Sequence, residues 1–183
     1  MRRIAMLRFP AAALAAALCV APAWAAPASV AAVWAPRRVH FVYQGFTTRY
    51  SCGGLRDQIE SMLRKLGARD LTVRSDPCVR PDGVDPFPGV RVTMRVLVPA
   101  TAREAGNSRV AAHWRKVVVA SDAADFNEGG QCELIAQFRR VFLPLFAARH
   151  IDLRATCVPH QVTMSSYLSA EVLVADSVPT AGH

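Results

Sequence analysis

The stretch Cys52-GGLRDQIESMLRKLGARDLTVRSDP-Cys78 recurs later in the chain as Cys132-ELIAQFRRVFLPLFAARHIDLRAT-Cys157. The two cysteines lie 26 positions apart in the first copy and 25 in the second. Between them, Leu66-Gly67-Ala68-Arg69 aligns with Phe146-Ala147-Ala148-Arg149, and Leu71-x-Val73-Arg74 aligns with Ile151-x-Leu153-Arg154. We infer that one structural unit is used twice, and that a pair of cysteines brackets each copy.

A helix is expected near the start of each copy. In residues 55–66, apolar side chains recur at helical spacing on one stripe, and Gly67 is a typical helix end. The second helix is expected over residues 133–148, where Leu134, Phe138 and Phe142 follow the same spacing. Pro144 lies inside this range and predicts a kink or an early end, because proline removes a backbone donor and clashes with the preceding turn.

Strands are expected before and after each helix. Residues 90–98 alternate between apolar and polar side chains, which is typical of a half-buried strand. Further strands are expected at residues 39–43, 71–74, 114–120, 151–155 and 161–174. The order is therefore β-α-β-β, used twice. It predicts an α+β fold with a mainly antiparallel sheet, two helices on one face and two disulfides. We expect the copies to share one sheet around a pseudo-twofold axis, and two separate lobes are the alternative.

The first 25 residues have the organisation of a secretion signal. Arg2, Arg3 and Arg8 precede the apolar run 11–20, and Ala23-Trp24-Ala25 is a cleavage site of the A-x-A type. Cleavage near Ala25 predicts a periplasmic or secreted protein. After it we expect a flexible leader at 26–36, a single domain at 37–175 built of two repeats (37–99 and 112–175), and a disordered tail at 176–183. No later segment is long and apolar enough to span a membrane.

The mature chain keeps four cysteines, Cys52, Cys78, Cys132 and Cys157, once Cys19 is removed with the signal. An even number in an oxidising compartment predicts disulfides, and four cysteines allow three pairings. The repeat favours Cys52–Cys78 and Cys132–Cys157. Each bridge would then tie the start of a helix to the end of the following strand.

Strand alternation places four arginines, Arg74, Arg91, Arg95 and Arg154, on the sheet face opposite the helices. Guanidinium groups bind carboxylates and phosphates through paired hydrogen bonds, so this face is the predicted ligand-binding site. One alternative is a solvated face with cross-strand ion pairs such as Arg154 with Glu171. Another is a surface for a protein partner or a homodimer, because Val42 and Val118 also lie on it.

Other functions have less support in the sequence. A binding face for nucleic acid needs interleaved aromatic residues, and export removes the usual nucleic-acid targets. The motifs of serine hydrolases, zinc proteases and phosphate-binding loops are absent from the sequence, and the histidines are scattered singly. Cys157 and His160, with Met164, have spacing that suits a metal, but a disulfide is the stronger interpretation of Cys157. Asp122, Asp125 and Glu128 do not match a calcium loop.

The expected function is therefore that of an exported, non-catalytic binding or interaction module. It requires no cofactor and no metal, and its partner is an anionic ligand or a protein. A small secreted hydrolase that uses a His and a carboxylate, and a metal-handling protein that uses Cys157 and His160, are the alternatives.

Overall fold

The computed structural model describes residues 29–46, 49–80, 83–101, 109–120, 131–155, 157 and 166–176. The expected signal segment at 1–25 and the tail beyond residue 176 lie outside the described residues.

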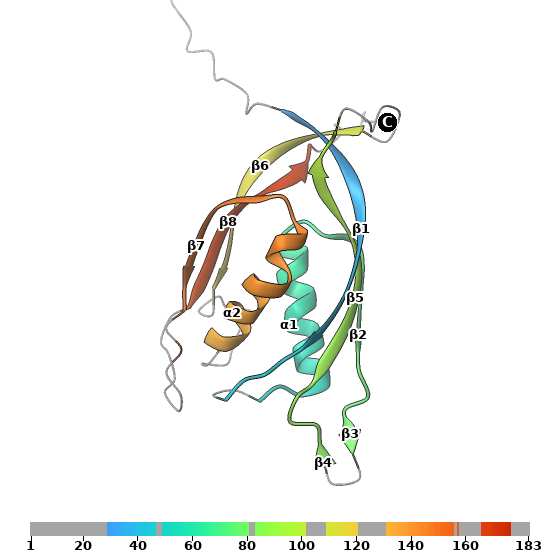
Figure 1. The fold of residues 1–183 in the computed structure, drawn as a ribbon, viewed down its shortest axis with the longest axis vertical. Helices are drawn as coiled ribbons and strands as arrows, with labels where there is room; N and C mark the ends of the chain where they lie inside the picture. Colours follow the sequence, from blue (N-terminus) through green and yellow to red (C-terminus); the bar gives the residue numbers. More distant parts are fainter. Residues whose placement is uncertain are drawn as a thin grey trace, which may run out of the picture.

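Six antiparallel strands form the main sheet, in the order β2-β5-β1-β6-β8-β7. Their bounds are β1 Val30–Val42, β2 Arg69–Ser75, β5 Gly89–Pro99, β6 Arg109–Ala120, β7 Ala148–Arg154 and β8 Tyr167–Ala175. Two short strands, β3 (Val79–Arg80) and β4 (Gly83–Val84), form a separate hairpin that projects from one end of the molecule (Figure 1). The helices are α1 (Cys52–Lys65), α2 (Cys132–Val141) and the short 3₁₀ helix η1 (Leu143–Leu145).

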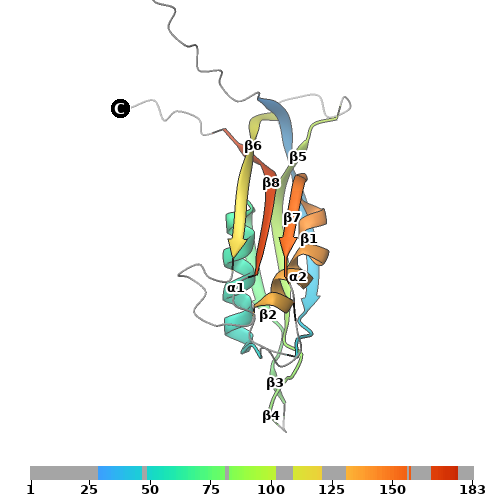
Figure 2. The same cartoon turned by 90° about the vertical axis from the view of Figure 1, so that its left-hand side faces the viewer.

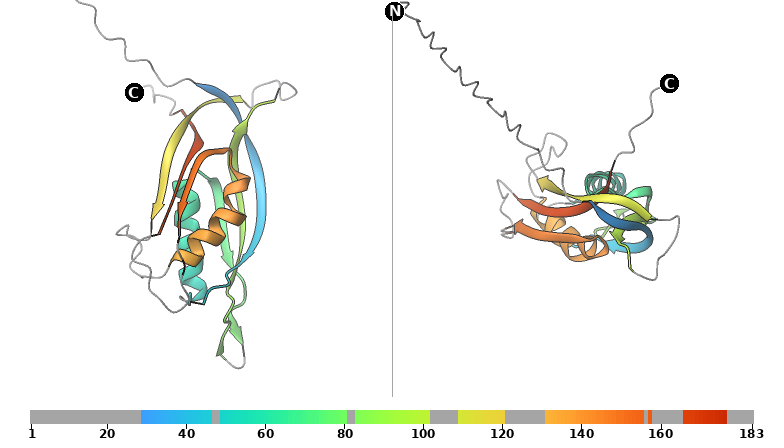
Figure 3. Two further views of the ribbon diagram at one scale, coloured as in Figure 1. Left: turned by 60° about the vertical axis from the view of Figure 1, so that its left-hand side comes forward. Right: turned by 90° about the horizontal axis from the view of Figure 1, so that it is seen from above.

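The sheet is sharply bent where its two halves meet. Strands β1 and β6 pair only between Val30–Val33 and Arg109–Ala112. Beyond this short ladder the three strands β1, β5 and β2 diverge from β6, β8 and β7, and both helices lie between the two halves (Figures 1 and 3). Figure 2 shows β6, β8 and β7 side by side. The expected α+β architecture, with a mainly antiparallel sheet and two helices on one face, is confirmed.

The two halves share their order of elements and several local irregularities. In each half the first strand is innermost, the last is central and the strand after the helix lies at the edge. Both edge strands carry a bulge, and Asp70 (φ 48°) and His150 (φ 49°) take the left-handed conformation at equivalent positions. The β3–β4 hairpin belongs to the first half alone among the described residues. Tandem duplication of one ancestral unit stays a prediction.

Two expected boundaries were wrong, and a third lies where the proline of the second helix predicted. Strand β1 begins at Val30, so the leader expected over 26–36 is in large part sheet. Its alanines and Pro36 hide the alternation of apolar and polar residues that indicates a strand. The segment is a strand because it pairs with β5. Strand β6 likewise begins at Arg109, before the expected repeat boundary at 112. Helix α2 ends at Val141, before the last residue of the expected range 133–148, which is the early end that Pro144 predicted; this proline lies in η1.

The core fills the space between the two halves and takes side chains from both. Phe41 of β1 packs edge-on against Phe142 at the end of α2, with ring centroids 5.4 Å apart. The helices contribute the buried residues Leu55, Ile59, Met62, Leu63, Leu134, Ile135 and Phe138. A second, smaller cluster lies on the other side of the sheet at the β1–β6 junction and contains Ala32, Leu97, Ala112 and Leu173.

Both expected disulfides are present. Cys52 is bonded to Cys78 with Cα atoms 6.0 Å apart, and Cys132 is bonded to Cys157 with Cα atoms 5.5 Å apart. Each bridge joins the first residue of a helix to the chain just beyond the strand that follows it. The bridges therefore close equivalent loops in the two halves.

Candidate functional site: the outer face of the sheet

Strand β5 presents a polar face away from the helices. Arg91, Thr93 and Arg95 are exposed, whereas Val92 and Met94 between them are buried. This alternation follows from the pleat of a strand, in which successive side chains point to opposite faces. The expected parity of the strand is therefore present in the structure, and the arginines lie on the side that the helices leave open.

Neighbouring strands extend this polar face in rows. Arg74 of β2 lies opposite Arg91 of β5, and Arg91 lies opposite His40 of β1. In the next row, Thr93 of β5 lies between Thr72 of β2 and Arg38 of β1. The result is a basic surface across three strands, which we call the arginine face. Its basic members are Arg38, His40, Arg74, Arg91 and Arg95.

Asp76 neutralises part of this surface. Its carboxylate lies 2.5 Å from Nε2 of His40 and 3.1 Å from Nε of Arg91, and its side chain is 19% exposed. Gly89 leaves room for this arrangement, because a Cβ atom there would lie 2.5 Å from Oδ2 of Asp76. No carboxylate among the described residues pairs with Arg74 or with Arg38.

Arg95 lies at one border of the arginine face. It forms an ion pair of 3.6 Å with Asp70, and both side chains are well exposed. Arg69, opposite Arg95 in the ladder, stacks over the ring of Trp34 with its Cζ atom 4.9 Å from the ring centroid. The stack occupies the Arg69 guanidinium, so Arg95 is the more accessible of the two for a ligand.

Arg154 is separated from the other three predicted arginines. It lies on β7, in the half of the sheet that diverges from β2 and β5. Its guanidinium stacks over Tyr167 at 5.6 Å, and the Tyr167 hydroxyl donates a 2.8 Å hydrogen bond to Asp152. That hydrogen bond raises the pKa of Tyr167. The structure therefore brings Arg74, Arg91 and Arg95 together and places Arg154 in a different environment.

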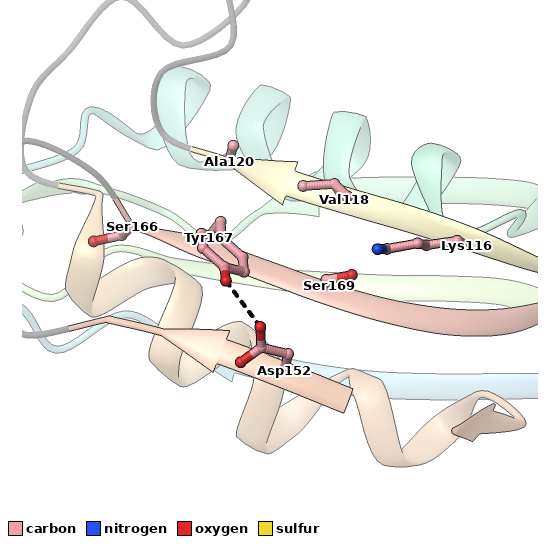
Figure 4. Close-up of a pocket in the computed structure, with 7 residues that line it drawn as sticks. All are labelled: Lys116, Val118, Ala120, Asp152, Ser166, Tyr167 and Ser169. Carbon is pink, nitrogen blue, oxygen red and sulfur yellow. Dashed lines mark hydrogen bonds between the residues drawn. The ribbon is translucent and has the colours of Figure 1, made fainter. Parts of the chain in front are cut away.

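In the second half of the sheet, a polar hollow of about 360 Å³ lies where the first half has the arginine face (Figure 4). Lys116 of β6 and Asp152 of β7 lie on either side of Ser169 of β8, and Asp152 points toward Tyr167 at one end of the hollow. The described lining of the hollow includes one cation, Lys116, and one carboxylate, Asp152, so it lacks the excess of positive charge that the first half displays.

The sequence did not reveal a second arginine stack, between Arg149 and Trp114. The Arg149 Cζ atom lies 4.2 Å from the ring centroid of Trp114, and Nε lies 2.8 Å from Glu171. Hydrogen bonds from Arg149 and then His150 lower the pKa of Glu171. Glu171 thus pairs with Arg149 rather than with Arg154. The stack matches that of Arg69 on Trp34, and the alignment of the two copies was the signal that could have revealed it.

Among the described residues, two histidines form hydrogen bonds with aspartates, His40 with Asp76 and His113 with Asp176, which bears on the hydrolase alternative. His113 Nδ1 lies 2.5 Å from Asp176 at the margin of a hollow that Trp34 and Arg69 also line. Ser29 donates its hydroxyl to the same carboxylate at 3.2 Å. The aspartate therefore lies between the serine and the histidine, whereas an activated serine must contact the imidazole. The His40–Asp76 pair lies on the arginine face.

The metal alternative falls mostly outside the described residues. His160 and Met164 are not among them, and Cys157 is disulfide-bonded to Cys132. Within the described part of the chain, no group of three or more His, Cys, Asp or Glu side chains is placed to hold a metal ion. The loop that contains Asp122, Asp125 and Glu128 also lies outside the described residues.

Comparisons with protein-family models, curated proteins and solved structures return no match to this chain. Among the described residues, no helix is long and apolar enough to cross a membrane.

Proposed function

We propose that this protein is an exported, non-catalytic binding module that captures an anionic ligand or an acidic protein partner on the arginine face. The observation that carries the proposal is the row formed by Arg74, Arg91 and His40 on three adjacent strands, with Asp76 as its nearest described carboxylate. The row holds more positive than negative charge, and its side chains are exposed.

The cost of this arrangement to the fold supports a role in binding. Like charges directly opposite one another on antiparallel strands destabilise a sheet, and Arg74 lies opposite Arg91. Solvation of a sheet face alone does not require two arginines in that register. A bound carboxylate or phosphate would offset the repulsion, because each guanidinium can donate two parallel hydrogen bonds to such a group.

The two disulfides support the proposed compartment. Disulfides persist in the periplasm and outside the cell and are rare where glutathione and thioredoxin keep thiols reduced. The signal-like segment that precedes the described residues favours the same location. We therefore expect the arginine face to meet its partner in the periplasm or beyond the cell.

The test uses a polyglutamate probe and two double variants with the same net charge. Arg74→Ser/Arg91→Ser removes two charges from the arginine face, and Arg56→Ser/Arg64→Ser removes two from the exposed side of α1. We expect isothermal titration calorimetry at low salt to show at least tenfold weaker binding for the first variant. The second should change affinity by less than about twofold, and both should keep the wild-type melting temperature within a few degrees.

Equal affinities for the two variants would show that only net charge matters and would contradict the proposal. A wild-type dimer that Arg74→Ser/Arg91→Ser dissociates would also contradict it, since the face would then serve self-association. Light scattering on the same samples separates these results.

A further inference from the structure

The two helices cover their neighbouring edge strands unequally. In the first half α1 packs on β2, so that Leu71 is half-buried and Val73 is only 9% exposed. Their equivalents on β7 are Ile151, which is 44% exposed, and the half-buried Leu153. The helix-facing side of β7 is therefore less covered than that of β2, although the two strands occupy equivalent positions at opposite edges of the sheet.

Polar contacts tie α2 to the chain just beyond β1 in the other half. Glu133 accepts hydrogen bonds from the Tyr43 hydroxyl (3.2 Å) and from the Phe46 amide (2.9 Å). Gln137 accepts from the Gln44 amide (3.1 Å) and donates to the Gln44 carbonyl (2.6 Å). These contacts fasten α2 to the end of β1, and the helix runs obliquely between the two halves (Figure 1).

A hollow of about 580 Å³ occupies the space between α2, η1 and β7. We call it the α2–β7 groove. Its apolar lining consists of Ala136, Leu143, Pro144, Phe146, Ala148, Ile151 and Leu153. Arg139 and Arg140, in the last turn of α2, are the charged residues that line it, and no carboxylate is among its described lining. The groove is therefore apolar at its floor and cationic along the wall formed by α2.

The groove lies beside an unpaired sheet edge. Strand β7 pairs with β8 on one side, and no described segment pairs with its other side. An edge strand leaves alternate N–H and C=O groups without a ladder partner, and such an edge is a template for a further strand. On the other edge of the sheet, α1 packs against β2.

We propose that the α2–β7 groove binds an extended peptide, which carries apolar anchor side chains and at least one carboxylate and adds to β7 as a further strand. The main chain of the peptide takes up the free hydrogen-bonding groups of β7, and its apolar side chains cover Ile151 and Leu153. Its carboxylate meets Arg139 or Arg140, neither of which has a described acidic partner. Hydrogen bonds along the edge supply affinity in this mode, and side-chain pockets supply specificity.

This surface is separate from the arginine face. It lies on the helix side of the second half, whereas Arg74 and Arg91 lie on the outer side of the first half. Loss of one binding activity can therefore be measured independently of the other.

The test is a selection of random ten-residue peptides, displayed on phage, against the folded mature protein. We expect enriched peptides that combine large apolar residues with Asp or Glu. By fluorescence polarisation, Ile151→Glu and Arg139→Ser/Arg140→Ser should each weaken a selected peptide at least tenfold. The matched controls are Val118→Glu, at an exposed apolar position on β6, and Arg56→Ser/Arg64→Ser, and both should bind within about twofold of the wild type. Amide hydrogen exchange in β7 should slow when the peptide binds.

Several results would overturn the proposal. They are a selection without enrichment, enriched peptides that are basic, and binding that Ile151→Glu leaves unchanged. Unchanged exchange in β7 would exclude strand addition. A dimer that Ile151→Glu dissociates would show that a second copy of this chain fills the groove instead.

Discussion

At the scale of single residues, Tyr43 links the core to the start of α2. Its side chain is 1% exposed, its ring packs edge-on against Tyr50 at 5.0 Å, and its hydroxyl donates to Glu133. Burial first, and then the negative charge of Glu133, raise the pKa of this hydroxyl far above its ordinary value of 10.0. The folded protein therefore keeps the phenol proton at pH values at which the unfolded chain releases it.

This difference predicts a specific sensitivity to alkali. Above about pH 10 the unfolded state binds fewer protons than the folded state, so the free energy of unfolding falls as the pH rises, by up to ~1.4 kcal/mol per pH unit for one group. At pH 8, Tyr43→Phe should cost about 1 kcal/mol for the lost hydrogen bond. Between pH 10 and 11 the variant should lose less stability than the wild type. Urea unfolding at pH 8, 10 and 11 measures both effects, and parallel stability curves would contradict the assignment.

Bulge residues on the edge strands illustrate the limits of alignment at this scale. Asp70 and His150 have the same offset from their cysteines and the same left-handed conformation, yet their side chains contact different partners, Arg95 and Glu171. The backbone irregularity is thus shared by the two halves while the charges around it are not. Equivalent positions in the repeat indicate equivalent geometry, but they do not indicate equivalent chemistry.

At the scale of elements, the position of α2 depends on a few polar contacts with the chain at the end of β1. Glu133 lies in the first turn of the helix, where a negative charge also interacts favourably with the helix dipole. Because its carboxylate accepts from Tyr43 and from Phe46, it connects the two halves of the molecule.

We therefore expect Glu133→Ala to lower the free energy of unfolding by about 1–3 kcal/mol, since two hydrogen bonds to a charged acceptor are lost. The matched control is Glu60→Ala on α1, whose carboxylate forms an exposed pair with Arg64 four residues later. That change should cost only about 0.3–0.5 kcal/mol. Urea unfolding followed by circular dichroism gives both values. A cost for Glu133→Ala no larger than for Glu60→Ala would show that the contacts with Tyr43 and Phe46 do not determine the stability of α2.

At the scale of the whole molecule, the two halves share one core. Phe41 comes from the first half and Phe142 from the second, and the buried cluster that contains them extends from α1 to β8. The β1–β6 ladder that joins the halves is short, so this shared packing, rather than the sheet, is the main connection between them.

A shared core predicts one cooperative unfolding transition. Trp34 lies on β1 in the first half and Trp114 on β6 in the second, both beside the cluster at the β1–β6 junction, and the third tryptophan, Trp24, belongs to the expected signal segment. Each half can therefore be followed by fluorescence in the mature Trp114→Phe and Trp34→Phe variants respectively. Within each variant we expect the fluorescence curve in urea to coincide with the curve followed by circular dichroism, as for a two-state domain of this size. Two separated midpoints, with one probe unfolding before the other, would show that the halves are independent lobes.

The sequence by itself determined the class of fold, the order of the two main helices and the six strands of the main sheet, the pairing of the cysteines and the parity of Arg74, Arg91 and Arg95. All of these depend on local periodicity or on the comparison of one stretch with another. The tertiary structure decided the early start of β1, the sharp bend at the β1–β6 junction and the separation of Arg154 from the other arginines. It also decided the oblique position of α2 and the groove beside β7. These features depend on contacts between residues far apart in the chain, such as Glu133 with Tyr43. The spacing of residues along the sequence does not show which distant residues meet.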